Sequence, residues 1–468
     1  MKWTRKRFLL LPYVALLAIL VVVGCTSKED PSETLTTCGN HSCGDLVMVT
    51  TDTSSDGFHY LNASLSPDGS QILFSADWKA MPSDPRDPGD ELYTSYRQLV
   101  VIPIQEGTEP TSSLADQGAT LIRLFPQNNV WYKGRPQYIA QALDDDKAYP
   151  LWEDDQSVIF CLRSQEYLAD NYRLFRVDIS NPDLAPFVPL FMEPEDFFES
   201  PAPPFSQHLE PTLSPAGLAM GRWLVFTRSS CALVDSFETC TGTALWALDM
   251  NTAGDNFGYD TTFFPLTNEY SRLENPRFSP DGRKIIFSGG MDVSGAGTGA
   301  GTELFTIDFD TTGLDAGTMP LDRNLKRLTF TAVSPGDPIS GIFNSNPVYS
   351  NDGRNVYFIS TRRAPSITLH DRNVWRIPAD GSLDPVIHYF TRSDEADPSI
   401  MPDGRMLLSS ALGFPTEMLN RLEEEAYQRL VVEEPDLTEV QLREAASEER
   451  RQLEFFEGVM SHIYIYRP

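Results

Sequence analysis

Basic residues are scarce in this sequence. It has 37 lysines and arginines against 66 aspartates and glutamates, only six histidines, and a formal net charge of −29. A surface this acidic repels nucleic acids and anionic lipid headgroups, so the composition argues against DNA or RNA as a partner. The same charge keeps a protein soluble, and it also suits cation binding or docking on a basic partner.

The motifs of several catalytic classes are missing as well. No G-x-S-x-G, H-E-x-x-H or C-x-x-C-H segment occurs, and the histidines are scattered without metal-ligand spacing. These absences argue against a serine hydrolase domain, a zinc protease and covalent haem. We therefore predict no cofactor, with calcium as the one open possibility, and we expect the protein not to be an enzyme.

The pattern of the N-terminal residues predicts an export signal. Residues 1–24 hold four basic residues and then an apolar run from Phe8 to Val23, about 16 residues, which is short for a membrane span. Val22-Val23-Gly24-Cys25 resembles the lipobox of bacterial lipoproteins, which implies cleavage before Cys25 and a lipid on its thiol. The resemblance implies an outer-membrane anchor facing the periplasm, since Thr26 follows the cysteine; an uncleaved anchor is the alternative. Residues 25–44 are polar and suit a tether.

The remaining five cysteines suggest two disulfides. Cys38 and Cys43 lie five positions apart, and Cys231 and Cys240 flank a predicted hairpin loop. In an oxidising compartment both pairs predict small-loop disulfides. Cys161 follows an apolar run and is predicted to be a buried free thiol.

A turn followed by an apolar run repeats along the chain. Clear copies of the turn, Ser-Pro-Asp-Gly or a close variant, lie at 66–69, 279–282, 350–353 and 401–404. Degenerate copies lie near 150–160 and 210–227. Proline presets the first corner of such a turn and glycine takes its left-handed position. The following strand is apolar almost throughout, which indicates burial on both faces. A blade packed between two others in a β-propeller meets that condition.

These motifs resemble the TolB-type, WD-like propeller repeat, from about residue 60 to 411. The resemblance implies an all-β, six-bladed propeller over residues 45–468; seven blades, with one hidden in 104–148, are the alternative. This fold serves scaffolds, binding proteins and enzyme domains alike, so it does not specify a function.

Residues 415–458 depart from the repeat. Their apolar stripes predict two helices, broken at Pro435, before a last strand at 463–466, so this segment is a helical hairpin inserted in the last blade. The stripes either form a docking surface or pack on each other and on the last blade.

Five polar residues head the first strand of their repeats: Asn62, Glu210, Asn275, Asn346 and Asp397. Because the first strands of a propeller line its channel, we expect these side chains to converge at one mouth. There they would hold a hard cation such as calcium or hydrogen-bond a sugar; alternatively each bonds backbone within its own blade. The sequence thus predicts a non-enzymatic envelope protein that binds a protein or glycan with its propeller faces. The alternative is a periplasmic enzyme, lyase-like or part of a larger complex, with its site at the mouth.

Overall fold

The structure is a computed structural model of the chain. It describes residues 46–50, 60–77, 97–104, 114–126, 146–164, 171–190, 205–218, 221–234, 237–251, 263–294, 301–311, 320–331, 342–362, 372–389, 394–411, 416–435, 437–455 and 461–466. The predicted signal, the tether, Cys25, Cys38 and Cys43 lie outside these residues.

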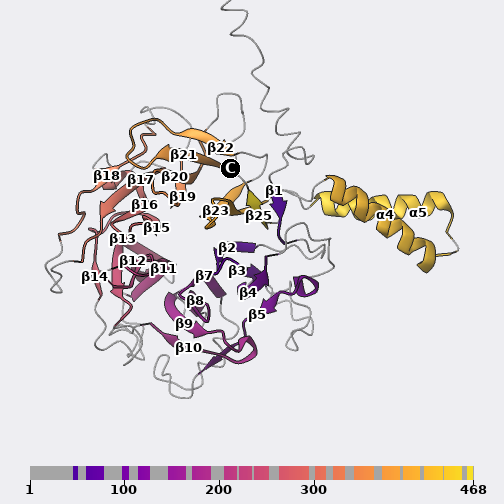
Figure 1. The fold of residues 1–468 in the computed structure, drawn as a ribbon, viewed down its shortest axis with the longest axis horizontal. Helices are drawn as coiled ribbons and strands as arrows, with labels where there is room; N and C mark the ends of the chain where they lie inside the picture. Colours follow the sequence, from indigo (N-terminus) through magenta and orange to yellow (C-terminus); the bar gives the residue numbers. More distant parts are fainter. Residues whose placement is uncertain are drawn as a thin grey trace, which may run out of the picture.

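Six sheets are arranged around a central axis, and the first strand of each lies nearest the centre (Figure 1). Blade 1 consists of β2 (Tyr60–Leu65), β3 (Gln71–Asp77), β4 (Arg97–Pro103) and β5 (Thr120–Leu121). Blade 2 consists of β7 (Asp146–Trp152), β8 (Ser157–Ser164), β9 (Asn171–Asp178), β10 (Ala185–Pro189) and β6 (Leu124–Pro126). Blade 3 consists of β11 (Phe205–Leu213), β12 (Trp223–Val234), β13 (Phe237–Asp249) and β14 (Phe263–Pro265).

The second half of the chain repeats this arrangement. Blade 4 consists of β15 (Leu273–Phe278), β16 (Lys284–Gly290), β17 (Thr302–Asp308) and β18 (Lys326–Arg327). Blade 5 consists of β19 (Asn344–Tyr349), β20 (Asn355–Ser360), β21 (Asn373–Pro378) and β22 (Val386–Tyr389). Blade 6 consists of β23 (Glu395–Ile400), β24 (Met406–Ser410), β25 (His462–Tyr466) and β1 (Leu46–Met48), so its outer strand comes from the start of the described chain.

The prediction of six blades is confirmed, and the seven-blade alternative is not realised. The described part of 104–148 forms the 3-10 helix η3 (Leu114–Gln117), β5 and β6 instead. β6 pairs in parallel with β10 and so extends blade 2. Two further 3-10 helices, η4 (Pro182–Leu184) and η6 (Met291–Ser294), lie in connections.

An apolar cluster fills each space between neighbouring blades. Between blades 6 and 1, for example, Leu407 and Ile465 pack against Ile72 and Phe74, all of them fully buried. The other five spaces hold corresponding clusters. Second and third strands are therefore buried on both faces, which is the reason for their continuous apolar sequence.

The repeated turn has the hydrogen bonds and the left-handed glycine that its sequence predicted. In blade 1 the Ser66 hydroxyl donates to Asp68 and accepts the Gln71 N–H, while Gly69 has a φ of 74°. The bonds from Ser66 and Ser70 lower the pKa of Asp68 to about 2. These local bonds fix the corner at which the first strand turns into the second.

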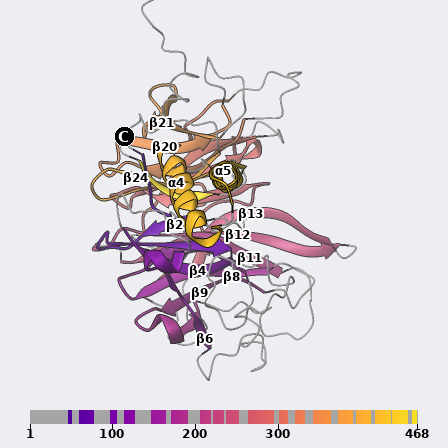
Figure 2. The same ribbon diagram turned by 90° about the vertical axis from the view of Figure 1, so that its right-hand side faces the viewer.

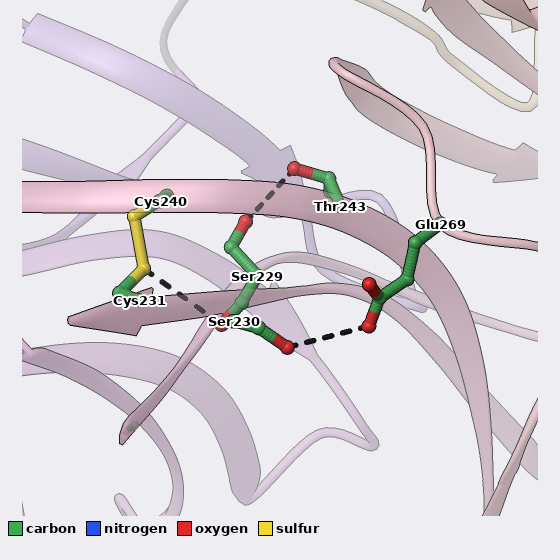
Figure 3. The surroundings of a disulfide bond; sticks show 6 residues. All are labelled: Ser229, Ser230, Cys231, Cys240, Thr243 and Glu269. Carbon is green, nitrogen blue, oxygen red and sulfur yellow. Dashed lines mark hydrogen bonds between the residues drawn. A yellow bond between two sulfur atoms is a disulfide. The ribbon is translucent and has the colours of Figure 1, made fainter. Parts of the chain in front are cut away.

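One hairpin is much longer than the others. β12 and β13 extend from the ring beyond the other strands (Figure 2), and the disulfide Cys231–Cys240 joins them across the ladder (Figure 3). Beside it, the hydroxyls of Ser229 and Thr243 are hydrogen-bonded at 2.9 Å. This predicted disulfide is present, and Cys161 is a fully buried free thiol, as expected.

Two helices, α4 (Thr416–Glu433) and α5 (Glu439–Phe455), lie between β24 and β25 and project from the rim of the ring (Figure 1). They bury Leu419, Ala426, Leu442 and Ala446, and only Leu419 joins the cluster between blades 5 and 6. The stripes therefore pack chiefly on each other. In the part of the chain described, neither helix combines the length and apolarity needed to cross a membrane.

Candidate functional site at the channel mouth

Six residues, one on the first strand of each blade, adopt a left-handed backbone conformation. We call them the belt; they are Asn62, Tyr149, Glu210, Asn275, Asn346 and Asp397, with φ between 48° and 56°. Non-glycine residues seldom adopt positive φ, and asparagine and aspartate tolerate it best. The same unusual conformation recurs in every blade, so the belt is a regular feature of the ring.

A β-bulge produces this conformation. In blade 3 the pairing jumps from Leu209 with Thr227 to Thr212 with Val225, so Glu210 and Pro211 oppose the single residue Phe226. The other five first strands show the same shift at the belt residue. A bulge leaves one backbone N–H without a ladder partner, and in five blades the residue after the belt position is a proline, which has no N–H; in blade 1 it is Ala63.

The belt residues of blades 6, 1 and 2 are hydrogen-bonded in sequence around the channel. The Asn62 N–H donates to Asp397 Oδ2 at 2.9 Å, and Asn62 Nδ2 donates to the same oxygen at 3.1 Å. The Tyr149 N–H in turn donates to Asn62 Oδ1 at 3.4 Å. Each side chain thus accepts from the backbone of the next blade.

Blades 3, 4 and 5 repeat the arrangement. Asn275 donates through its N–H to Glu210 Oε2 and through Nδ2 to Glu210 Oε1, the latter at 2.9 Å. The Asn346 N–H donates to Asn275 Oδ1 at 3.1 Å. These bonds cross between blades, whereas the sequence alternative placed them within each blade.

The two remaining boundaries are bridged differently. Between blades 5 and 6, Asn346 Nδ2 donates to Asp397 Oδ1 at 2.9 Å. Between blades 2 and 3, where a tyrosine phenol takes the belt position of blade 2, the Glu210 N–H faces the buried thiol of Cys161 and opposes the rise that burial causes in the pKa of that thiol. Five of the six boundaries therefore carry a hydrogen bond at the level of the belt, and the sixth has this contact of an N–H with a thiol.

The structure brings all five predicted mouth residues together and adds Tyr149 and Cys161, which sequence reasoning missed. Tyr149 precedes Pro150 as Asn275 precedes Pro276, so the proline marks the belt position even where the side chain is atypical. For Cys161 the sequence holds no comparable signal, since its partner belongs to another blade.

A cavity of about 360 Å³ lies above the belt. Its floor contains all six belt residues. Its wall comes from blades 4 and 5 and their connections, and consists of Arg272, Glu274, Thr302, Phe343, Ser345, Ile359, Thr361 and Arg372. The ring is nearly symmetric at the belt, but the described residues that form the wall all come from blades 4 and 5.

Charged groups meet at the channel axis. Glu210 and Asp397 belong to opposite blades, and Arg277 of blade 4 interacts electrostatically with both. Burial raises the pKa of Glu210 to about 8, and the charge of Glu274 adds to the effect. Burial also raises the pKa of Asp397, against the bonds from Asn62 and the charge of Arg277. Arg277 therefore lies close enough to both carboxyl groups for its charge to favour their ionised forms.

Among the described residues, no group of three or more histidine, cysteine, aspartate or glutamate side chains is arranged to hold a metal ion. The belt supplies two carboxyl groups and three amides, and most of their polar atoms are hydrogen-bonded to each other. Calcium binding at the belt stays a prediction.

Comparisons with known proteins give the fold alone. No protein-family model and no curated protein matches the chain. Among solved structures, TolB from Acinetobacter baumannii is 16% identical over 67% of this chain and 56% of its own, a little over half its length, with a TM-score of 0.36. A periplasmic gluconolactonase from Pseudomonas aeruginosa is 12% identical, covering 78% of this chain and 91% of its own, with a TM-score of 0.38. An oligogalacturonate lyase from Vibrio parahaemolyticus is 12% identical over 65% and 63%, with a TM-score of 0.34. Similarities this weak do not separate binding from catalysis.

Proposed function

We propose that this protein is a non-enzymatic binding protein of the cell envelope that holds a protein or glycan partner at its channel mouth. The observation that carries the proposal is the cavity of about 360 Å³, within the usual range for ligand pockets. Its floor is fixed by the belt hydrogen bonds, which supports recognition by a preformed surface. The hydroxyls of Ser345 and Thr361, the ring of Phe343 and the guanidinium of Arg372 line its wall.

Export and lipid attachment at Cys25 are part of the proposal. The basic start, the apolar run and Val22-Val23-Gly24-Cys25 support them. The disulfide Cys231–Cys240 adds support, because such bonds persist in oxidising compartments such as the periplasm. With Cys25→Ser we expect loss of the lipid mass and release from the outer-membrane fraction; unchanged partition would reject the anchor.

Site-specific photo-crosslinking in living cells tests binding at the mouth. A photoreactive residue replaces Arg272, which is exposed at the cavity wall and is not needed for the ligand contact, and the matched control replaces Arg354, which lies away from the cavity in the β19–β20 turn. We expect a discrete adduct from position 272 only. No adduct at 272, or equal adducts from both positions, rejects the proposal.

A second candidate function is an enzyme with acid–base chemistry at the mouth, lyase-like or within a larger complex. The pKa of Glu210, about 8, favours it, because a carboxyl group that titrates near neutral pH can both give and take a proton. Elemental analysis of purified protein and turnover of uronic-acid oligomers before and after Glu210→Gln separate the two. Bound transition metal, or turnover that Glu210→Gln abolishes, favours the enzyme.

A further inference from the structure

Arginines concentrate at the mouth of this acidic protein. Arg272 and Arg372 line the cavity, and Arg277 interacts with Glu210 and Asp397 inside the channel. A fourth, Arg97 at the start of β4, lies near enough to lower the pKa of Asp397 and Tyr149. Basic residues are outnumbered by acidic ones across the chain, 37 to 66, so a group of arginines near one cavity departs from the overall pattern.

The cavity lining holds three carboxyl groups, Glu210, Glu274 and Asp397, and two arginines, Arg272 and Arg372. Asp394 also lies beside Arg372 and accepts its backbone N–H at 2.9 Å. Glu274 is already engaged with Arg272 at 2.5 Å, Asp397 faces the charge of Arg277, and burial raises the pKa of Glu210 to about 8, which leaves that group mostly neutral at pH 7. The guanidinium of Arg372 is therefore a positive charge at the wall that can attract a ligand of the opposite sign.

Arg372 is the arginine best placed to meet a ligand. Its side chain is exposed at the cavity wall, and among the described residues it has no hydrogen bond or ion pair. Arg272, in contrast, bonds Glu274 and lies 5.6 Å from the centre of the Phe343 ring. A guanidinium group presents a planar fork that matches the two oxygens of a carboxylate.

We propose that the channel mouth recognises its ligand through a carboxylate group, which pairs with Arg372 while the rest of the ligand lies against Phe343 and the hydroxyls of Ser345 and Thr361. The inference rests on the proposed function, since it assumes that the mouth is the binding site. A carboxylate of this kind occurs at the C-terminus of a peptide and on a uronic acid, and the experiment distinguishes these sources.

Calorimetric titration with two matched pairs of probes tests the inference. One pair is acetyl-triglycine and its C-terminal amide; the other is glucuronate and glucose. We expect the carboxylate member of one pair to bind at least about tenfold more tightly than its neutral counterpart, in line with the strength of charge-assisted hydrogen bonds. The pair that shows the difference identifies the source. Equal affinity within both pairs, or no binding of either carboxylate, overturns the inference.

Two arginine variants of blade 5 sharpen the test. Arg372→Gln should weaken binding of the preferred carboxylate about tenfold or more, while Arg354→Gln, at the opposite end of the blade, should leave it unchanged. Equal effects would show non-specific attraction and reject the inference. Crosslinking at position 272 without carboxylate preference would reject the inference and leave the proposed function standing. Absence of crosslinking at that position would reject the proposed function itself.

Discussion

The belt and the helical hairpin are both rich in polar groups, but they differ in burial. Asp397 in the belt accepts three hydrogen bonds from two neighbouring blades in a partly buried site. Across the hairpin, Arg429 pairs with Glu449 at 2.6 Å and Arg443 with Glu424 at 2.8 Å, with these side chains 43–52% exposed. The hairpin contacts are the shorter ones, yet water competes more strongly for them than for the belt bonds.

This difference decides which contacts stabilise the protein. A buried polar group left without its partner costs about 1–3 kcal/mol, and an exposed ion pair contributes about 0–1 kcal/mol. The hairpin carries far more charge, but the belt hydrogen bonds contribute more to the free energy of unfolding. Four measurements test this contrast, beginning with the largest expected effect.

Asp397→Ala should lower the free energy of unfolding by about 3 kcal/mol, because Asn62 and Asn346 lose their acceptor at two blade boundaries. Urea unfolding followed by tryptophan fluorescence measures it. Asp384→Ala is the control, since Asp384 is exposed and should change stability by less than about 0.5 kcal/mol. Similar losses in both variants would contradict the contrast.

Glu210 should make stability depend on pH. Its pKa is about 8 in the folded protein against 4.5 as the ordinary value, so between these limits the folded state binds a proton that the unfolded state has released. Stability from this group therefore falls as pH rises from about 4.5 to about 8. The unfolding free energy of wild type minus that of Glu210→Gln should decline across this window by up to a few kcal/mol.

Glu424→Gln on α4 is the matched control. Bonds from Gln428 and Arg443 lower the pKa of Glu424, so its difference from wild type should stay nearly constant between pH 5 and pH 8. A flat difference for Glu210→Gln as well would mean that Glu210 is not held in its buried, proton-retaining state.

Cys161→Ala should cost about 1–2 kcal/mol, because the Glu210 N–H loses the thiol that replaces a belt side chain. Cys161→Ser keeps an acceptor at that position and should lose less in the same urea titration. Equal losses would point to packing between blades 2 and 3 as the only role of the thiol.

The smallest effect belongs to the hairpin. A double-mutant cycle of Arg429→Ala and Glu449→Ala should give a coupling energy below about 0.5 kcal/mol, declining with added salt. A coupling as large as the loss in Asp397→Ala would remove the distinction between the two regions.

Local chemistry explains which features the sequence predicted. The turn at 66–69 is held by hydrogen bonds among its own residues, and the apolar strand after each such turn indicates burial on both faces. The blades and the five mouth residues could therefore be predicted from the sequence. Features that depend on contacts between blades could not be predicted in this way. They are the place of β1 as the outer strand of blade 6, the contact of Cys161 with Glu210, and the cavity wall around Phe343. No short segment of sequence encodes such contacts.

The pairing of β1 with β25 also sets the order of events in folding. Leu46 lies opposite Tyr466, so blade 6 is incomplete until residues 46 to 466 have been synthesised. Contacts between such distant residues form slowly, because the loop between them must close first. Until then β25 has an open edge, a template for pairing with other chains. Among the described residues, protection of this edge depends on the short strand Leu46–Met48 and on the bonds that Val49 and Thr50 make to Ile463.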